Sequence, residues 1–451
     1  MQIPILSGIF ADGSPNFRTS YPKNMIPVPK STGVSEGYLR PAEGIVELGT
    51  GPGVNRGGIN WNGSIYRVMG TKLVEIAQDN TVTEIGDVGS GDRVTFSYGF
   101  TYLAIVSGGR MYLYNGTTLT QVTDPDLGTA LDVVWVDGYF MTTDGEFLVV
   151  TDLDDPFAVN PLKYGSSEAD PDPVNALLKL RNEVYALNRY TIEVFDNVGS
   201  TGFPFQRIAG AQIQKGSVGT HANCVFMDNI AFLGGGFNEA PSIYMGANGS
   251  AVKIATREIE EILQEYTEAE LATAFLEERN DKAHTFLIVH LPRHTLVFDG
   301  AGSQATSQAV WFTLSSTLVG DGMWNACTCI WAYDRWNVCH PTTNQFGYLD
   351  DTISTHWGET IGWEFGTLIV YNNGQGAIFH DIELVSLTGS TAFGVDPTIW
   401  TQYSNDGVTW SAEKPIRAGK TGERNKRLMW LQQGHMRNKR MHRFRGTSDA
   451  H

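Results

Sequence analysis

Cysteine, charge and long apolar runs are all scarce in this sequence. It has four cysteines in 451 residues, at positions 224, 327, 329 and 339. So few thiols are typical of a protein made in a reducing compartment. No apolar run approaches the ~20 residues that span a bilayer, so we expect no membrane insertion. No basic segment precedes the apolar patch in MQIPILSGIFADG, so we expect no secretory signal and assembly in the cytoplasm.

Charged residues make up only 18% of the chain, against a usual share of ~25%. Glycine is abundant instead, with 50 residues, and aromatic residues reach 11%. The aromatic content excludes a disordered chain. Abundant glycine with little charge favours turn-rich β structure over helical bundles. We therefore expect a folded, all-β protein.

The charge is unevenly distributed along the chain. Residues 413–451 contain 11 Lys or Arg and three Asp or Glu, a net charge of +8. The remaining 412 residues therefore carry −25 of the total charge of −17. An acidic body argues against wrapping nucleic acid, because that binding needs cations that neutralise phosphates. It is compatible with a channel wall past which DNA slides without binding.

Residues 1–55 are rich in Pro and Gly and predict an extended N-terminal arm. Beyond it, pairs of short β-type runs recur at intervals of 36 to 57 residues, as in SIYRV with TKLVEI and TYLAIV with RMYLYN. A four-stranded propeller blade takes ~40–50 residues, and radial stacking covers its faces. We predict a β-propeller of six or seven blades over residues 56–350. Stacked β-sandwiches are the alternative.

Two further features complete the predicted organisation. Residues 256–280 have helical periodicity, with Ile259, Ile262 and Leu263 on one face and a capping box from Thr267 to Glu270. This helical insertion either caps the propeller or contacts another subunit. Residues 351–451 predict a β-sandwich-like module that ends in a basic hairpin. Within it, the Asp406-Gly407 pair in SNDGVTW is typical of a type I′ turn.

The sequence contains little that indicates catalysis or metal binding. HLPRH at 290–294 lacks the Glu of HExxH, and its proline favours a hairpin turn. Cys327 and Cys329 are spaced as alternate strand residues, so we expect both on one sheet face as buried thiols. The glycine clusters at 49–53 and 234–236 lack the residues of a phosphate loop. We predict no enzyme activity, no cofactor and no metal.

The basic C-terminal residues are the candidate site. They either bind nucleic acid or dock onto an acidic neighbouring subunit or adaptor, and apolar residues alternating with them favour docking. The predicted docking residues are Arg424, Lys426, Arg427, Arg437, Lys439, Arg440, Arg443 and Arg445.

Four segments resemble the packaged-DNA stabilisation proteins, the tail hub or nozzle family of short-tailed podovirus phages. They are EEILQEYTEAELATAFLEERNDKAHTFLIVHLPRHTLVFD (260–299), SEGYLRPAEGI (35–45), IYRVMGTKLVEIAQD (65–79) and the ending SNDGVTWS…KRLMWLQQGHMR. The 260–299 run is the most distinctive, and residues 300–400 agree least with the family pattern.

The resemblance implies a homohexameric ring in the virion tail, below the portal and its adaptor ring. It also implies a tail needle or plug and tailspikes as partners, and only passing contact with the genome. Three hypotheses follow. The first is a structural hub that retains packaged DNA and forms part of the conduit for its ejection. The others are a glycan-binding or glycan-hydrolysing propeller and a DNA clamp that uses the basic tail.

Overall fold

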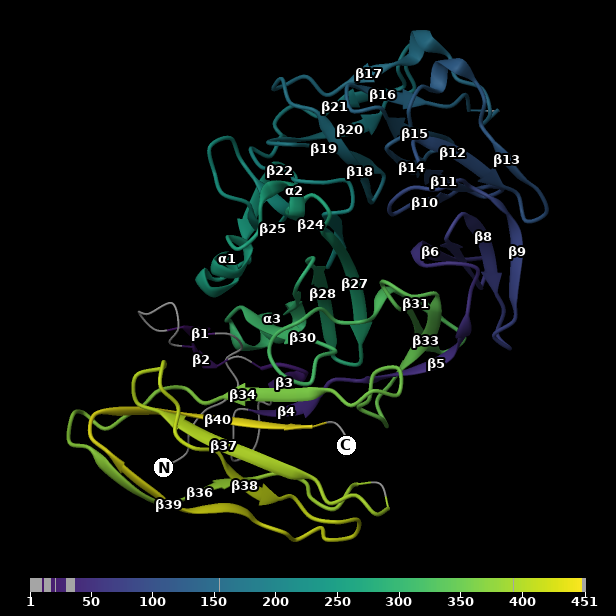
Figure 1. Cartoon of the computed structure of the whole chain (residues 1–451). Helices are drawn as coiled ribbons and strands as arrows, with labels where there is room; N and C mark the ends of the chain where they lie inside the picture. Colours follow the sequence, from purple (N-terminus) through teal and green to yellow (C-terminus); the bar gives the residue numbers. More distant parts are fainter. Residues whose placement is uncertain are drawn as a thin grey trace.

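The protein combines a ring of seven antiparallel sheets with a two-sheet sandwich (Figure 1). Its structure, a computed structural model, describes residues 10–11, 18–20, 22–29, 37–153, 155–391 and 393–447. The predicted fold class, an all-β propeller with a C-terminal sandwich, is confirmed, and the blades number seven. In the described part of the chain, no helix has the length and apolar character needed to cross a bilayer.

Six blades are built from strands that follow one another along the chain. Blades one to three contain β6 (Asn55–Trp61), β7 (Ser64–Met69), β8 (Lys72–Ile76), β9 (Val82–Asp87); β10 (Thr95–Tyr98), β11 (Leu103–Ser107), β12 (Arg110–Tyr114), β13 (Leu119–Gln121); β14 (Asp132–Val136), β15 (Tyr139–Thr143), β16 (Phe147–Val150), β17 (Gly165–Ser166). Blades four to six contain β18 (Val174–Leu180), β19 (Glu183–Asn188), β20 (Ile192–Asn197), β21 (Phe205–Arg207); β22 (Gly216–Ser217), β23 (Asn223–Phe226), β24 (Asn229–Gly235), β25 (Ser242–Ala247), β26 (Ser250–Lys253); β27 (Phe275–Asp281), β28 (His284–His290), β29 (Thr295–Asp299), β30 (Val310–Leu314).

The seventh blade joins the two ends of the propeller. It contains β31 (Cys327–Ala332), β32 (Arg335–Cys339) and β33 (Gln345–Asp350), and its fourth strand is β5 (Gly44–Thr50). Ile45 lies opposite Leu349 in the pairing of β5 with β33. The expected arm of residues 1–55 is therefore too long, because residues 44–50 belong to the propeller. The pairing partner is ~300 residues away in the sequence, and no local pattern identifies it.

The ring is complete because the inner strands of successive blades contact one another, and β31 contacts β6. Alternate residues of each strand point to opposite faces, so every blade contributes to two cores. In β19, Val184 and Ala186 pack against blade three, whereas Tyr185 and Leu187 pack against blade five. The faces of neighbouring sheets thus bury each other.

Two short helices, α1 (Arg257–Leu263) and α2 (Glu268–Leu271), separate blades five and six. The predicted apolar face of α1 is buried against both blades, which agrees with the propeller-cap interpretation. The capping box between Thr267 and Glu270 is present. The predicted helical insertion of 256–280 is too long, because residues 275–280 lie in β27 and pair with β28. A third helix, α3 (Gly300–Thr306), and two 3-10 turns, η1 (Pro125–Leu127) and η2 (Pro161–Lys163), were not predicted.

Short strand pairs precede the propeller in the chain. β1 (Phe10–Ala11) pairs with β2 (Arg18–Ser20), and β3 (Met25–Pro29) pairs with β4 (Gly37–Pro41). β3 also contacts β30 of blade six and β34 of the sandwich. This N-terminal segment therefore lies where the two parts of the molecule meet.

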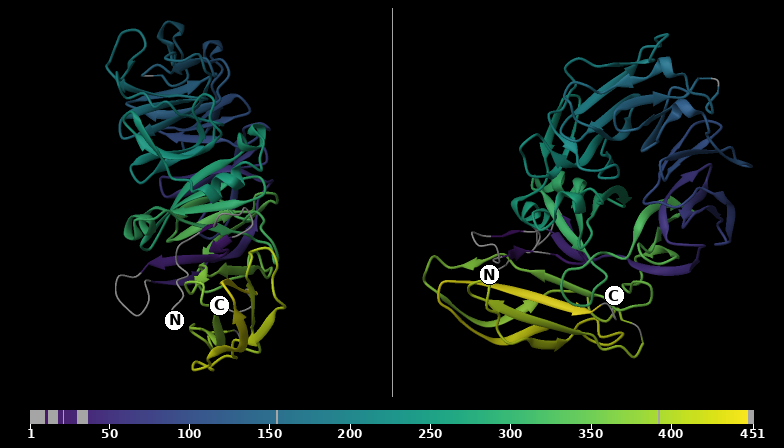
Figure 2. Two further views of the ribbon diagram at one scale, coloured as in Figure 1. Left: turned by 90° about the vertical axis from the view of Figure 1, so that its left-hand side faces the viewer. Right: turned by 45° about the horizontal axis from the view of Figure 1, so that its top comes forward.

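The sandwich lies beside blades six and seven (Figure 2). Its larger sheet contains β34 (Gly362–Gly366), β35 (Val370–Tyr371), β37 (Thr398–Ser404), β38 (Lys414–Arg417) and β40 (Lys439–Thr447). The smaller sheet contains β36 (Ala377–Leu384) and β39 (Leu428–Met436). Apolar residues of both sheets, including Phe365, Ile399 and Leu428, form the core between them.

The predicted terminal hairpin is wrong, because β39 pairs with β36 whereas β40 lies in the other sheet. Crossing between sheets lets Trp430 and Phe444 meet across the core, with 5.5 Å between ring centroids. A hairpin would place both rings in one sheet.

The Asp406-Gly407 turn also differs from the prediction. A type I′ turn needs a positive φ at both central residues. Gly407 has a φ of +78°, but Asp406 is absent from the positive-φ positions of the described chain, so the turn is not type I′.

Candidate assembly surfaces and the propeller centre

Three of the predicted docking arginines are engaged inside their own chain. Arg440 is 1% exposed, donates to the carbonyls of Gln433 and His435, and stacks on Tyr403 at 3.9 Å. Arg445 forms two hydrogen bonds of 2.6 Å with Glu413. Arg440 is therefore removed from the predicted docking set, because burial makes its guanidinium inaccessible to another subunit.

Arg443 is half-buried and lies 3.5 Å from the Glu364 carboxylate, with its guanidinium 4.4 Å from the ring centroid of Trp410. The sequence pattern alone could not distinguish these three arginines from docking residues. The alternation of apolar and polar residues identifies the buried side of a strand, but it does not identify what a long side chain contacts.

The other five basic residues lie nearer the surface. Arg427 makes two hydrogen bonds with Glu383, at 2.7 and 2.6 Å, and Lys426 lies 3.7 Å from Glu423. Lys439 is half-buried. Arg424 and Arg437 are exposed, and neither side chain has a partner among the described residues. The structure does not gather all eight residues into one cluster.

Residues Lys23 and Asn24 join the propeller to the sandwich. The backbone N–H of Lys23 donates to Glu364 of the sandwich, and that of Asn24 donates to Thr313 of blade six. The Asn24 amide also donates to the carbonyls of Ser315 and Gly362, at 2.8 Å each. We did not predict this joint, since an Asn in an irregular arm carries no periodic signal.

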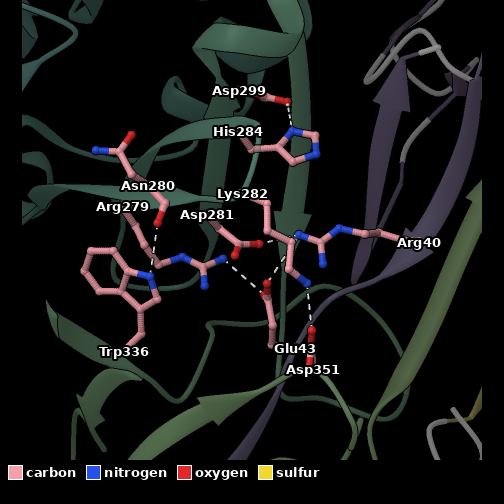
Figure 3. A network of polar contacts seen from close by, with 10 residues as sticks. All are labelled: Arg40, Glu43, Arg279, Asn280, Asp281, Lys282, His284, Asp299, Trp336 and Asp351. Atoms are coloured by element: carbon pink, nitrogen blue, oxygen red, sulfur yellow. Dashed lines mark hydrogen bonds and ion pairs between the residues drawn. The ribbon is translucent and has the colours of Figure 1, made fainter. Parts of the chain in front are cut away.

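A buried polar network fixes the arm to blade six (Figure 3). Arg40 of β4 lies 2.5 Å from Asp281, and Glu43 lies 3.1 Å from Arg279. Burial opposes ionisation of Glu43, but the guanidiniums of Arg279 and Arg40 outweigh burial and lower its pKa to about 2. The only indication of this network in the sequence was the pair of charged residues, Arg40 and Glu43, within the segment YLRPAEGI.

Nearby contacts extend the network shown in Figure 3. Lys282 in the turn of blade six lies 2.7 Å from Asp351, which follows blade seven. Nδ1 of His284 lies 2.6 Å from Asp299, the carboxylate that also caps α3. The network therefore ties together the arm, blade six and the exit from blade seven.

Side chains from several blades meet near the centre of the propeller. Arg93, which precedes β10 of blade two, stacks on Phe275 of blade six at 3.5 Å and donates to Thr328 of blade seven. Burial, with a contribution from the charge of Arg93, lowers the pKa of His221 in blade five to about 4. Arg93 therefore spans the centre of the ring. The centre of a single propeller is consequently not an open passage for DNA.

The titratable groups of the propeller have structural partners. Burial raises the pKa of Asp132 to about 7, and its carboxylate accepts from the backbone N–H groups of Val133 and Leu177, which ties blade three to blade four. In HLPRH, His290 bonds Glu277 and His294 bonds Tyr266, so the two rings have separate partners. Among the described residues, no cluster of three His, Cys, Asp or Glu side chains could hold a metal.

One cleft holds two carboxylates. It has a volume of about 540 Å³, and Glu239 and Glu260 both line it. A hydrogen bond from Lys215 lowers the pKa of Glu239. Burial of Glu260 acts in the opposite sense, but the hydrogen bonds from Lys253 and Ser242, together with the charge of Lys253, outweigh burial and lower that pKa. A glycosidase needs one protonated carboxyl as its general acid, and neither group supplies one near neutral pH.

Cys327 and Cys329 do not share a sheet face, contrary to prediction. Thr328 between them has a φ of +56°, and the pairing with β32 is irregular there. This bulge turns Cys327 towards the core with blade one and Cys329 towards the core with blade six. Both remain thiols packed within the protein, and burial raises both pKa values.

Several known proteins are similar to this chain. The chain is 29% identical over 464 residues to the tail hub protein gp10 of Salmonella phage P22, covering 97% of this chain and 94% of that protein. Among solved structures, the Pan2 WD40 domain of Neurospora crassa matches with 11% identity, a TM-score of 0.43, and coverage of 68% of this chain and 94% of that one. The N-terminal domain of Nup159 has 8% identity and a TM-score of 0.42, with coverage of 77% and 99%.

Two family descriptions divide the chain between them. Residues 1–354 match the β-propeller of bacteriophage P22 Gp10, and residues 362–451 match its β-sandwich. The division coincides with the passage from β33 to β34. The chain therefore belongs to the family of bacteriophage P22 Gp10, the tail hub family of short-tailed phages.

Proposed function

We propose that this protein is a structural subunit of a phage tail hub that retains the packaged genome and forms part of its exit conduit. Similarity to the P22 tail hub protein over nearly the whole of both chains carries the proposal. The protein is accordingly a component of the virion tail, and we propose that it is assembled in the host cytoplasm. Its role is mechanical and not enzymatic.

The conduit must be formed between copies of the chain. Arg93, Phe275 and Thr328 meet at the propeller centre, so a single subunit offers no central passage there. A closed ring of identical subunits, which we propose is a hexamer, would enclose a lumen of its own. The net charge of −25 over residues 1–412 supports a wall that repels DNA.

The proposed partners are other components of the tail. They are the portal-adaptor ring above, a needle or plug at the lower mouth, and tailspikes on the side. We propose that the exposed basic residues of the sandwich, Arg424, Arg427 and Arg437, with Lys426 and Lys439, dock onto an acidic neighbouring surface. Neutralising such charges should chiefly slow association and make it less dependent on salt.

DNA retention tests the function directly. Particles assembled without this protein should package DNA and then lose it, because nothing closes the channel. The DNA content of purified particles should be measured at successive times after lysis, with particles that received the wild-type chain in trans as the control. Full retention of DNA without the protein would contradict the proposal.

A further inference from the structure

Two loops lie together at one end of the sandwich. The first connects β36 to β37, and the second connects β38 to β39. Leu384, the last residue of β36, lies opposite Leu428, the first residue of β39. The first loop therefore leaves the smaller sheet where the second loop enters it. We call these loops, residues 385–391, 393–397 and 418–427, the sandwich tip.

Hydrogen bonds join the two loops of the sandwich tip. The Thr388 hydroxyl donates to the backbone carbonyl of Glu423 at 2.9 Å. The Thr421 hydroxyl donates to the backbone carbonyl of Thr391 at 2.7 Å. The two loops are therefore one structural unit, and side chains from both can face the same partner.

Three apolar side chains of the sandwich tip lie almost fully in water. Val385 is 90% exposed, and Leu387 and Phe393 are each 99% exposed. These side chains consequently pack against almost nothing of their own chain. Groups of exposed apolar side chains mark protein or membrane contacts. Their burial requires a partner outside this chain.

The same end of the sandwich presents positive charge. Residues 383–397 and 417–428 contain five Lys or Arg and three Asp or Glu, a net charge of +2 in a chain of −17. Each acid pairs with a different cation: Glu383 with Arg427, Asp396 with Arg417, and Glu423 with Lys426. The remaining two cations, Lys420 and Arg424, are exposed, and neither side chain has a partner among the described residues. The charge available to a partner is therefore positive.

A bilayer with anionic headgroups fits both properties of the sandwich tip. Hydrocarbon accepts protruding apolar side chains of any shape, whereas a protein partner needs a pocket that matches them. Anionic headgroups attract Lys and Arg near the membrane surface. The phosphates of DNA would also attract these cations, but they would leave the three apolar side chains in water.

We propose that the sandwich tip binds the surface of a bilayer with anionic headgroups. Val385, Leu387 and Phe393 enter the boundary between headgroups and acyl chains, and Lys420 and Arg424 contact the headgroups. The contact is peripheral and does not cross the bilayer. This lipid-binding activity goes beyond the proposed hub function and does not rest on it.

The acidic propeller does not cancel this attraction. Charges separated by more than ~8 Å are largely screened at physiological salt. The sandwich lies beside blades six and seven, so the other side of the ring is far from it (Figure 1). The nearest charges, those of the sandwich tip, therefore decide the sign of the interaction with the membrane.

Vesicle binding by the full chain tests the inference. The chain should sediment with vesicles that contain phosphatidylglycerol, and much less with vesicles of phosphatidylcholine alone, because only the former attract cations. Added salt should weaken the binding, because salt screens the charges. A wild-type chain that binds neither kind of vesicle, or binds both equally, contradicts the inference.

A matched pair of substitutions tests the apolar residues. Leu387→Ser should weaken vesicle binding about tenfold, because the inserted side chain loses its apolar contribution. Leu162→Ser is the control and should bind normally. Leu162 is 84% exposed in η2, between the outer strands β16 and β17 of blade three, which lie at the opposite end of the molecule from the sandwich (Figure 1). Wild-type binding by Leu387→Ser would overturn the inference.

A second pair of substitutions tests the cations. Lys420→Gln should weaken vesicle binding about fivefold. Lys420 is chosen because Arg424 also belongs to the proposed docking set. Arg437→Gln is the control, since Arg437 is exposed but follows β39 at the other end of that strand. Equal losses in the two variants would mean that binding does not depend on the sandwich tip, which contradicts the inference.

A fluorescent label reports insertion directly. An environment-sensitive dye on Leu387→Cys should brighten and shift to the blue with phosphatidylglycerol vesicles, whereas the dye on Leu162→Cys should not change. The wild-type chain, treated with the same dye, gives the background from native thiols. An unchanged signal at position 387 would show that the tip does not enter the bilayer, and the inference would be wrong.

A protein partner gives a different result. If Leu387→Ser weakens self-association of the chain and leaves vesicle binding unchanged, the sandwich tip contacts another copy and the inference is wrong. Normal circular dichroism of the variants would exclude misfolding. The DNA-retention assay decides the hub function separately in every case.

Discussion

Individual buried residues make the stability of this protein dependent on pH. His442 is 1% exposed inside the sandwich, and neither ring nitrogen has a hydrogen-bond partner among the described residues. Burial, with a contribution from the nearby charge of Arg440, lowers its pKa to about 3. Burial also lowers the pKa of His356 to about 4. The folded protein therefore holds these rings neutral.

The sign of the pH effect follows from these pKa values. An unfolded histidine has a pKa of about 6.5, so at lower pH the unfolded chain binds protons that the folded chain does not. The free energy of unfolding should fall by about 1.4 kcal/mol per pH unit for each such histidine, well below pH 6.5 and above its folded pKa. Replacing His442 by Leu should make this decline shallower. Urea unfolding at pH 7 and at pH 5 measures this decline in the free energy of unfolding, and the exposed His380→Leu variant is the control. If the decline in the His442→Leu variant equalled that of the wild type, the low pKa assigned to His442 would be wrong.

The Glu43–Arg279 pair gives a second prediction. The two side chains are 10% and 3% exposed. Removing one partner of a buried pair leaves the other charge uncompensated, so Glu43→Ala should lower the free energy of unfolding by about 3–5 kcal/mol. Glu383→Ala breaks the exposed pair with Arg427 and should change the unfolding midpoint little. If both substitutions lowered the free energy of unfolding equally in chemical denaturation, burial of the Glu43–Arg279 pair would not explain the loss of stability.

At the scale of elements, β5 closes the propeller. Without it, β33 would leave an unpaired edge, and blade seven would lose contacts between Ile45 and the core with blade six. A chain that starts at residue 51 should unfold with lower cooperativity and a reduced soluble fraction. A chain that starts at residue 44 keeps β5 but also lacks Glu43, and is the control. Equal melting curves for the two chains would mean that β5 does not stabilise the ring.

At the scale of the whole molecule, Asn24 couples the propeller to the sandwich. Its amide oxygen accepts from the Ser315 N–H at 2.9 Å, in addition to its two donated bonds. Asn24 has a φ of +54°, which glycine adopts without strain, so Asn24→Gly removes only the side chain. The cost should be about 1–3 kcal/mol, because buried backbone groups lose their partners.

In the Asn24→Gly variant, calorimetry should resolve separate unfolding transitions for the propeller and the sandwich. In the wild type these two transitions should lie closer together. Asn62→Gly, at a turn position of blade one with a φ of +52°, is the matched control and should leave the trace unchanged. A single unshifted transition for Asn24→Gly would show that other contacts hold the two parts together.

The fold class, the propeller and sandwich, the capping box and the family could all be predicted from the amino-acid sequence. These depend on local regularities: alternation along strands, a recurring spacing near blade length, and short distinctive segments. Four features became evident only in the folded chain: the pairing of β5, the placement of β39 and β40 in different sheets, the bulge between Cys327 and Cys329, and the burial of Arg440. Each of these features depends on contacts between residues that lie on opposite sides of a core or far apart in the sequence. A local sequence pattern does not identify such contacts.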